Sequence, residues 1–158
     1  MIRKANINDL NSIKNLLEEI LYVHHKLRPD IFKEKGQKFS DDELLSFLKD
    51  DNNLIFVYEI DGKVVGHLFL DIKIYNETGA THPYKTLFIE DLSIDEDYRR
   101  QGIGKSLMNF AFDYAKTIGA GNVKLHVWEG NTSAIKFYES LGMKPQKHVF
   151  EYLLEKSN

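Results

Sequence analysis

Residues 89–108 read Ile89-Glu90-Asp91-Leu92-Ser93-Ile94-Asp95-Glu96-Asp97-Tyr98-Arg99-Arg100-Gln101-Gly102-Ile103-Gly104-Lys105-Ser106-Leu107-Met108. An apolar strand runs into a turn rich in arginine and glycine, and the turn opens directly into a helix. A helix start leaves its first backbone N–H groups without partners and carries the positive end of the helix dipole. Glycine lets a ligand approach those groups, and Arg99, Arg100 and Lys105 add positive charge. The stretch therefore predicts a turn that binds a diphosphate.

Three phosphate-binding motifs compete for this turn, and their spacing separates them. Gly104-Lys105-Ser106 matches the end of a P-loop, but the first glycine of that motif would fall at position 99, which is Arg99. A dinucleotide-binding fingerprint needs a third glycine at position 107, which is Leu107. That fingerprint also belongs in the first strand-to-helix unit of a domain, whereas about half of this chain precedes the turn. What remains is the pattern Arg99-x-x-Gly102-x-Gly104.

A second segment follows an alternating strand and reads as a short helix that ends at Gly142: Asn131-Thr132-Ser133-Ala134-Ile135-Lys136-Phe137-Tyr138-Glu139-Ser140-Leu141-Gly142-Met143. Together the two segments resemble the cofactor motifs of the GCN5-related N-acetyltransferase (GNAT) superfamily, Q/R-x-x-G-x-G/A and N-x-x-A-x-x-F-Y-x-x-x-G-F. Only the last position departs from the second motif, with Met143 in place of phenylalanine. The motifs occur in the family's order and at about its separation, and the resemblance is least clear from Val23 to Phe39.

The resemblance implies that acetyl-CoA is the cosubstrate and that the first motif holds its diphosphate. It assigns cofactor binding to two sets of residues, one from each motif region: Leu92, Ser93, Ile94, Arg99, Arg100, Gln101, Gly102, Ile103, Gly104, Lys105 and Ser106, and then Asn131, Ala134, Phe137 and Tyr138. We expect Leu92 and Ile94 to offer backbone groups to the pantetheine amides, as a neighbouring strand would. Two roles stay open for Asn131, the N-cap of its helix and a polar contact to the pantetheine arm.

Acetyl transfer to an amine makes few chemical demands. The amine must be neutral, the developing oxyanion needs a donor, and the CoA thiolate needs a proton as it leaves. An alkylamine with a pKa near ~10.4 is protonated at neutral pH, so a proton acceptor is useful. The resemblance implies that Glu90 accepts the amine proton, often through water, and that Tyr138 protonates the thiolate. The alternatives are that Glu90 is an exposed strand carboxylate and Tyr138 a core aromatic.

Strand alternation bears on Asp91, the neighbour of Glu90. Successive side chains of a strand point to opposite faces, so we expect Asp91 to face away from Glu90. A β-bulge would change which of the two carboxylates faces the cleft.

Composition is that of an ordinary globular protein. The chain has 158 residues, 42% of them hydrophobic, and we predict one N-acetyltransferase domain over residues 1–158. The absence of cysteine excludes disulfides and thiolate nucleophiles, so acetyl transfer is direct or uses another nucleophile. With neither an apolar signal core at the N-terminus nor a run of eighteen apolar residues, we expect a cytoplasmic protein without a membrane partner.

Charge and histidine spacing limit the other ligands. The net charge of −3 argues against a nucleic-acid partner and is compatible with a cationic substrate. The six histidines, which include His24, His25 and His67, show no metal-ligand spacing, so we predict no metal.

The resemblance implies a mixed α/β (α+β) fold of the GNAT type. It has a central, mostly antiparallel sheet of about six to seven strands and about four flanking helices. The sheet splays between the strand that ends at Ile94 and the strand that begins at Val123. Periodicity predicts strands at 2–5, 54–60, 63–74, 86–94, 123–127 and 149–154. It predicts a helix that Asn8 caps and residues 28–30 end, a helix from the capping box 40–43 through Leu48, and helices at 104–118 and 131–142.

Three functions stay open at this stage. The first is an N-acetyltransferase for a small amine, since the Glu90-Asp91 pair resembles polyamine-type members of the family. The second is an acetyltransferase of protein N-termini or lysines, and the third is a non-catalytic acyl-CoA-binding module. A homodimer is suggested only by the resemblance, through the terminal strand or exposed apolar segments.

Overall fold

The computed structural model describes residues 1–154 of the chain, which group into two compact units, one from Met1 to His126 and one that begins at Val127. The strands of the first unit are β1 (Ile2–Lys4), β2 (Asn53–Ile60), β3 (Lys63–Tyr75), β4 (Tyr84–Ile94) and β5 (Asn122–Lys124). Its helices are α1 (Leu10–Leu27), α2 (Asp41–Phe47) and α3 (Ile103–Thr117), with the short 3₁₀ helices η1 (Ile7–Asp9) and η2 (Glu96–Tyr98).

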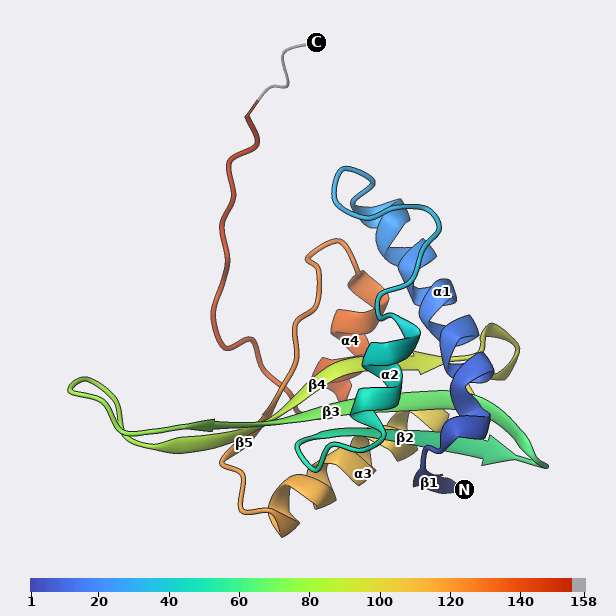
Figure 1. The fold of residues 1–158 in the computed structure, drawn as a ribbon. Helices are drawn as coiled ribbons and strands as arrows, with labels where there is room; N and C mark the ends of the chain where they lie inside the picture. Colours follow the sequence, from blue (N-terminus) through green and yellow to red (C-terminus); the bar gives the residue numbers. More distant parts are fainter. Residues whose placement is uncertain (155–158) are drawn as a thin grey trace. The chain divides into compact units, whose positions relative to one another are not determined.

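The five strands form one sheet in the order β1-β2-β3-β4-β5. The pairs from β1 to β4 are antiparallel, and β5 pairs with β4 in parallel. Figure 1 shows α1 and α2 on one face of the sheet and α3 on the other. The predicted mixed, mostly antiparallel fold is confirmed, although the described residues form five strands rather than six or seven.

Local signals explain most of the element boundaries. Ser40 accepts a hydrogen bond from the backbone N–H of Glu43, and so begins α2 as the capping box predicts. Asp61 and Gly62 have φ values of 48° and 80° in the tight β2–β3 turn. The prediction that Asn8 caps the first helix is wrong, since α1 begins after Asp9 without a side-chain cap, and Asn6 caps the preceding η1.

Two apolar layers enclose the sheet. On the α1 and α2 face, Ile13, Leu16 and Leu44 pack with strand residues such as Ile55 and Phe69. The buried residues of α3 form the other layer: Ile103, Leu107, Met108, Ala111 and Ala115. Each buried leucine, isoleucine or methionine contributes on the order of 1.5–3 kcal/mol, so these layers hold α1 and α3 against β3 and β4, and α2 against β2.

Close packing sets the start of α3. A Cβ at Gly66 of β3 would lie 3.0 Å from Cδ1 of Ile94 and 3.4 Å from Cδ1 of Leu107. Glycine at this position therefore lets the end of β4 and the first turns of α3 approach β3 closely.

The pairing of β4 with β5 is short. It runs only from Thr86↔Asn122 to Phe88↔Lys124, whereas β4 continues to Ile94. Residues 89–94 thus have β3 on one side and no paired strand of the first unit on the other. This is the predicted splay, and β5 is shorter than the predicted strand 123–127 because pairing stops there.

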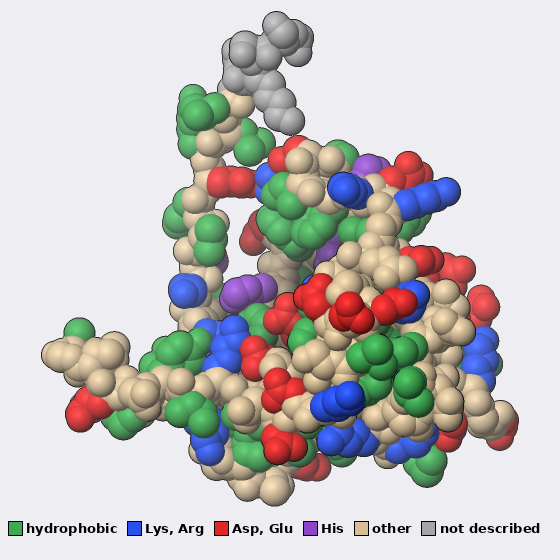
Figure 2. Space-filling view, in the orientation of Figure 1, with side chains coloured by type: hydrophobic (Ala, Val, Ile, Leu, Met, Phe, Trp, Pro, Cys, Tyr) green, Lys and Arg blue, Asp and Glu red, His purple; other side chains and the backbone are tan. Residues whose placement is uncertain are grey.

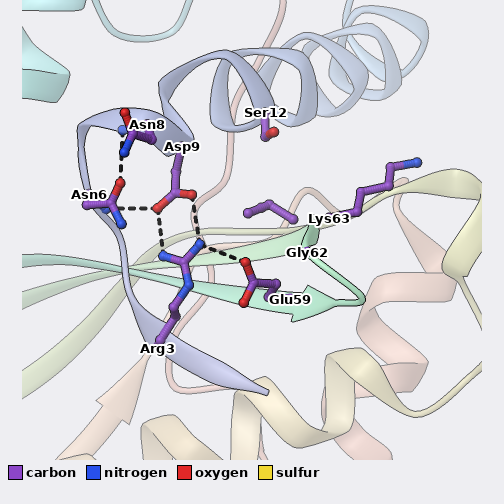
Figure 3. A pocket seen from close by; sticks show the side chains of 9 residues that line it. Arg3, Asn6, Asn8, Asp9, Ser12, Glu59, Gly62 and Lys63 are labelled. Carbon is purple, nitrogen blue, oxygen red and sulfur yellow. Dashed lines mark hydrogen bonds and ion pairs between the residues drawn. The ribbon is translucent and has the colours of Figure 1, made fainter.

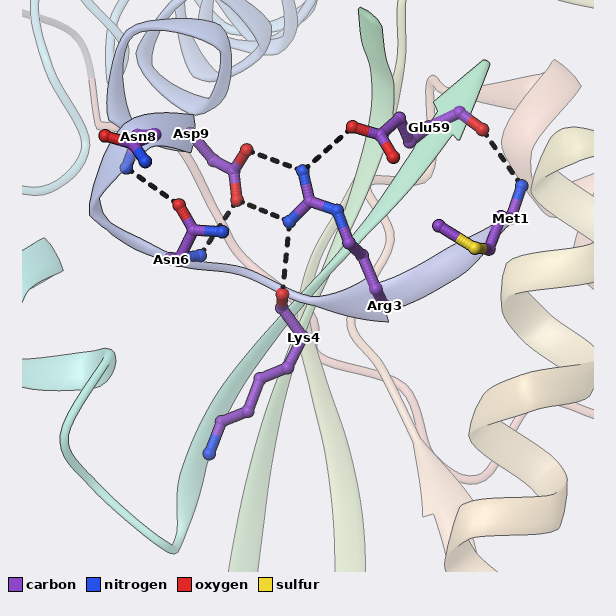
Figure 4. Close-up of polar contacts among 7 residues, drawn as sticks. All are labelled: Met1, Arg3, Lys4, Asn6, Asn8, Asp9 and Glu59. Carbon is purple, nitrogen blue, oxygen red and sulfur yellow. Dashed lines mark hydrogen bonds and ion pairs between the residues drawn. The ribbon is translucent and has the colours of Figure 1, made fainter. Parts of the chain in front are cut away.

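A polar cluster ties the first strand to its neighbours. The guanidinium of Arg3 donates to both carboxylate oxygens of Asp9 at 2.8 and 2.9 Å, and to Glu59 at 3.2 Å (Figure 4). The hydrogen bond from Arg3 lowers the pKa of Asp9. These residues line an open polar pocket of about 430 Å³, which Figure 3 shows from close by. Because their charges are paired with one another, the cluster fastens β1 to η1 and β2.

The second unit contains α4 (Thr132–Ser140). Asn131 caps the helix by accepting the N–H of Ala134 at 3.4 Å, and Gly142 ends it with φ of 91°. Residues 143–154 form no helix or strand, so the predicted strand 149–154 is wrong. An apolar run becomes a strand only where its backbone groups find a partner ladder, and among the described residues this run has none.

None of the described helices is long and apolar enough to cross a membrane. Figure 2 shows acidic and basic side chains interspersed over the face that carries α1 and α2.

Candidate active site

The turn between β4 and α3 has the backbone shape of an anion-binding loop. Arg100 and Gly102 both have left-handed φ values, 62° and 81°, immediately before the helix begins at Ile103. Left-handed residues in a turn direct successive N–H groups toward one side. No side chain caps α3, in contrast to the capped start of α2. The first backbone N–H groups of α3 are therefore available to an anion.

Cationic side chains surround this helix start. Arg99, Arg100 and Lys105 are exposed, as are Gln101 and Ser106, while Ile103 is buried and anchors the first turn. Arg99 donates from Nε to the carbonyl of Ile94 at 3.2 Å, which holds the base of its side chain against the end of β4. The predicted diphosphate residues thus lie together around one turn.

Glu19 of α1 was not predicted as part of this region. Its Oε2 lies 3.9 Å from Nη2 of Arg99. Burial raises the pKa of Glu19, and the nearby carboxylates of Asp95 and Glu96 add to that effect. The position of Glu19 on α1 does not predict that it lies near Arg99, because the two residues are far apart in sequence and are brought together only by the tertiary fold.

The unpaired part of β4 leads away from the turn. Leu92 lies opposite Leu68, and Ile94 opposite Gly66, beneath α3. Ser93 faces the other way and is buried, with its hydroxyl donating to Oδ2 of Asp91 at 2.9 Å. The side chain of Ser93 therefore supports Asp91, whereas the backbone of this strand forms the open edge.

A β-bulge at Glu90 overturns the expected alternation. Phe69 pairs with Asp91 and Leu70 pairs with Ile89, so Glu90 is the extra residue of β4. The ammonium of Lys38 lies 3.9 Å from Oε1 of Glu90 and 3.4 Å from Oδ1 of Asp91. Since one ammonium reaches both carboxylates, Glu90 and Asp91 point to the same face of the sheet.

Asp91 is the most constrained carboxylate of this group. Its side chain is 4% exposed, and its Oδ2 accepts from Nε2 of His67 at 2.5 Å and from Ser93. Burial opposes its ionisation, but the hydrogen bond and the electrostatic influence of His67, the positive charge of Lys38 and the hydrogen bond from Ser93 together outweigh burial, and the pKa of Asp91 is lowered. Asp91 is therefore a fixed anion at neutral pH.

His67 lies behind Asp91 on β3 and is fully buried. Because a carboxylate only accepts, Nε2 of His67 is the donor, and its Nδ1 is buried without a hydrogen-bond partner. The pairing of His67 with Asp91 was not predicted from the sequence. The signal was present, since His67 interrupts an apolar run from Val64 to Leu70, and a polar residue inside a buried strand needs a partner.

Glu90 is the accessible carboxylate of the pair. Its side chain is 39% exposed, and it lines a small hollow of about 20 Å³ with Phe47 and Phe69. His24 of α1 lies within electrostatic reach of Asp91 and Lys38. Burial lowers the pKa of His24, with opposing influences from the charges of Asp91 and Lys38. Among residues 1–154, no three histidine or carboxylate side chains gather as a metal site.

The second unit carries the other predicted residues. Asn131 is the N-cap of α4, which is one of its two predicted roles. Ala134, Phe137 and Tyr138 lie on α4 and are partly exposed, and the rings of Phe137 and Tyr138 lie 5.2 Å apart at 58°.

Comparison with known proteins identifies the family. Residues 16–143 match the model of the acetyltransferase (GNAT) family, and the chain belongs to this family, as the two motifs predict. The uncharacterized N-acetyltransferase MJ1207 of Methanocaldococcus jannaschii is 31% identical over 145 residues, covering 90% of this chain and 63% of that protein. The chain thus spans less than two thirds of that relative's length.

Solved structures have the same fold. A mutant of the BH1408 protein from Bacillus halodurans superposes with a TM-score of 0.95 at 26% identity, covering 98% of this chain and 99% of that one. The aminoglycoside N-acetyltransferase AAC(6')-Iy, in complex with CoA, has a TM-score of 0.73 at 17% identity and covers 99% of this chain and 100% of that one. The second likeness shows the fold alone.

Proposed function

We propose that this protein is an acetyl-CoA-dependent N-acetyltransferase that moves an acetyl group directly to a primary amine of a small cationic molecule. The observation that carries the proposal is the pair of carboxylates at the β4 bulge, Glu90 and Asp91, which together contact an ammonium group. Asp91 supplies a fixed negative charge, and the accessible Glu90 supplies a proton acceptor.

We propose that acetyl-CoA binds along the open edge of β4. Its diphosphate would lie at the start of α3, where the N–H groups of Ile103, Gly104 and Lys105 have no side-chain cap. Its pantetheine amides would pair with the backbone of Leu92 and Ile94, which no strand of the first unit covers. Ile94 lies four positions after Glu90, a span of about 13 Å along a strand, so an extended arm directs the thioester toward the bulge.

The chemistry then needs two proton transfers. Glu90 accepts a proton from the bound ammonium, directly or through water, and the neutral nitrogen attacks the thioester carbonyl. The carbon–sulfur bond breaks, and we assign the protonation of the departing thiolate to the phenol of Tyr138, which is restored by the proton that the nitrogen loses as the amide forms. The chain has no cysteine, so an acetyl-cysteine intermediate is excluded.

This mechanism uses residues of both compact units, and we propose that residues 1–158 work as one N-acetyltransferase domain. The family match supports it, since residues 16–143 include α1 of the first unit and α4 of the second. A homodimer and a cytoplasmic location stay predictions from the sequence.

The test is the release of free CoA thiol from acetyl-CoA with a panel of amines from neutral to alkaline pH. Polyamines, amino acids, aminoglycosides and short peptides cover both substrate classes. We expect release with a small cationic amine, and a loss of about 100-fold or more in Glu90→Gln and in Tyr138→Phe. Release with peptides alone would move the substrate class to proteins, and CoA binding without release on any amine would indicate a binding module.

A further inference from the structure

Lys38 occupies the position next to Glu90 and Asp91 that an acceptor amine would need. It lies on the segment between α1 and α2, and its Nζ donates to the backbone carbonyl of Glu90 at 3.0 Å. The same atom lies 3.4 Å from Oδ1 of Asp91 and 3.9 Å from Oε1 of Glu90. One primary ammonium therefore contacts the bulge carbonyl and both carboxylates of the proposed acceptor site.

Other lysines of the first unit make simpler contacts. Lys63 pairs with Asp95 at 3.6 Å, and Lys73 pairs with Asp71 at 3.9 Å. Lys73 resembles Lys38 in exposure, with 37% of its side chain exposed against 34%. Surface pairs of this kind are weak, whereas Asp91 is held in place by His67 and Ser93 before any cation arrives. Lys38 therefore differs from Lys73 in the groups that its ammonium contacts and not in its exposure.

We propose that Lys38 is an acetyl acceptor of this protein's own reaction, so that the enzyme acetylates itself at Lys38. The proposal rests on the proposed function, because it uses the same bound acetyl-CoA and the same base. The ammonium of Lys38 gives a proton to Glu90, and the neutral Nζ attacks the thioester carbon. A nitrogen–carbon bond forms as the carbon–sulfur bond breaks, and CoA leaves as the thiol. No redox step is involved.

Acetylation would change the site in a defined way. It removes the positive charge that contacts Glu90 and Asp91 and leaves a neutral amide in its place. Both carboxylates would then be free to receive the ammonium of another molecule. Unmodified Lys38 therefore competes with a cationic substrate, and modified Lys38 does not.

The experiment incubates the full chain with acetyl-CoA and no added amine, and follows each lysine by peptide mass spectrometry. We expect one acetyl group on Lys38, formed at least about tenfold faster than on Lys73. The rate constant should not depend on protein concentration, because donor and acceptor are in one molecule. Lys73→Arg should leave the rate at Lys38 unchanged, and Glu90→Gln should lower it about 100-fold.

Equal rates at Lys38 and Lys73, or a rate that rises with protein concentration, would overturn the inference. Both readouts use the wild-type chain, so they stand even if Glu90→Gln fails to fold. Thiol release with added amines separates the two proposals. Release with an amine but no acetyl-Lys38 contradicts self-acetylation alone, whereas no release and no acetyl-Lys38 contradicts the proposed function as well.

Discussion

Asp91 is the residue where the buried polar contacts of the first unit converge. It accepts from His67 and Ser93 on one oxygen and faces Lys38 with the other. A carboxylate that is 4% exposed is stable as an anion only because these groups replace its water. Its contribution to stability should therefore depend on pH.

The pKa of Asp91 is lowered in the folded chain, so its ionisation stabilises the fold above the unfolded pKa of about 3.9. This contribution is lost as pH falls through the lower, folded-state pKa. We expect Asp91→Asn to reduce the free energy of unfolding by about 1–3 kcal/mol at pH 7 and by less near pH 3, where the unfolded chain is already protonated. Urea unfolding at the two pH values measures both differences.

Asp71 of β3 is the matched control. Burial raises the pKa of this carboxylate, with Lys73 acting in the opposite direction. Its ionisation therefore costs stability above the unfolded pKa, and Asp71→Asn should leave stability unchanged or raise it by up to about 1 kcal/mol. The account of Asp91 is wrong if the two asparagine variants change stability at pH 7 in the same direction.

At the scale of residues, the sequence indicates which carboxylates could act in catalysis, but it does not predict which side chains lie together. The role of Glu90 was predicted from the resemblance and from its place on the strand before the turn, and it stays a prediction. The joint orientation of Glu90 and Asp91 depends on a bulge opposite Phe69 and Leu70, and no local pattern in the sequence marks it. Lys38 approaches from a segment of the chain where the resemblance was least clear.

At the scale of elements, the start of α3 depends on backbone conformation more than on side chains. Gly102 has φ of 81°, and a Cβ there would meet no atom within 4 Å. Gly119, after the other end of α3, has φ of 72° and equally open surroundings. An alanine at either position is strained only by its backbone, so the two glycines form a matched pair.

We expect Gly102→Ala and Gly119→Ala each to lower the free energy of unfolding by about 1 kcal/mol. Only Gly102→Ala should also weaken CoA binding, about tenfold, because it shifts the N–H groups at the start of α3. Calorimetric titration with CoA and urea unfolding of both variants measure these effects. Equal CoA affinities in the two variants would contradict the location of the diphosphate site.

Elements with strong local signals were predicted well, and those that depend on partners were not. The α2 capping box and the Asp61-Gly62 turn have the predicted structure because their geometry is set within a few residues. The length of β5 and the absence of a strand at residues 149–154 depend on where a ladder partner is available. Whether such a partner is available depends on distant parts of the chain and cannot be predicted from the residues of either segment.

At the scale of the whole molecule, the buried core and the predicted catalytic residues are distributed unequally. Among residues 1–154, the buried hydrophobic side chains lie between Ala5 and Ala115, and all belong to the first unit. The helix α4 has no fully buried residue, yet it carries Asn131 as its cap and Tyr138. The residues that stabilise the fold thus lie in the first unit, whereas the proposed catalytic residue Tyr138 lies in the second.

A fragment of residues 1–126 tests this separation. We expect it to unfold cooperatively, because it retains the five-stranded sheet and both apolar layers. We also expect it to release no thiol from acetyl-CoA with amines that the full chain accepts, since Asn131 and Tyr138 are missing. Urea unfolding and the thiol assay provide the two measurements, with full-length Tyr138→Phe as the control that keeps α4.

A fragment that is unfolded would mean that the core needs residues after 126. A fragment that retains full activity would remove Tyr138 from the mechanism and leave the chemistry to the first unit.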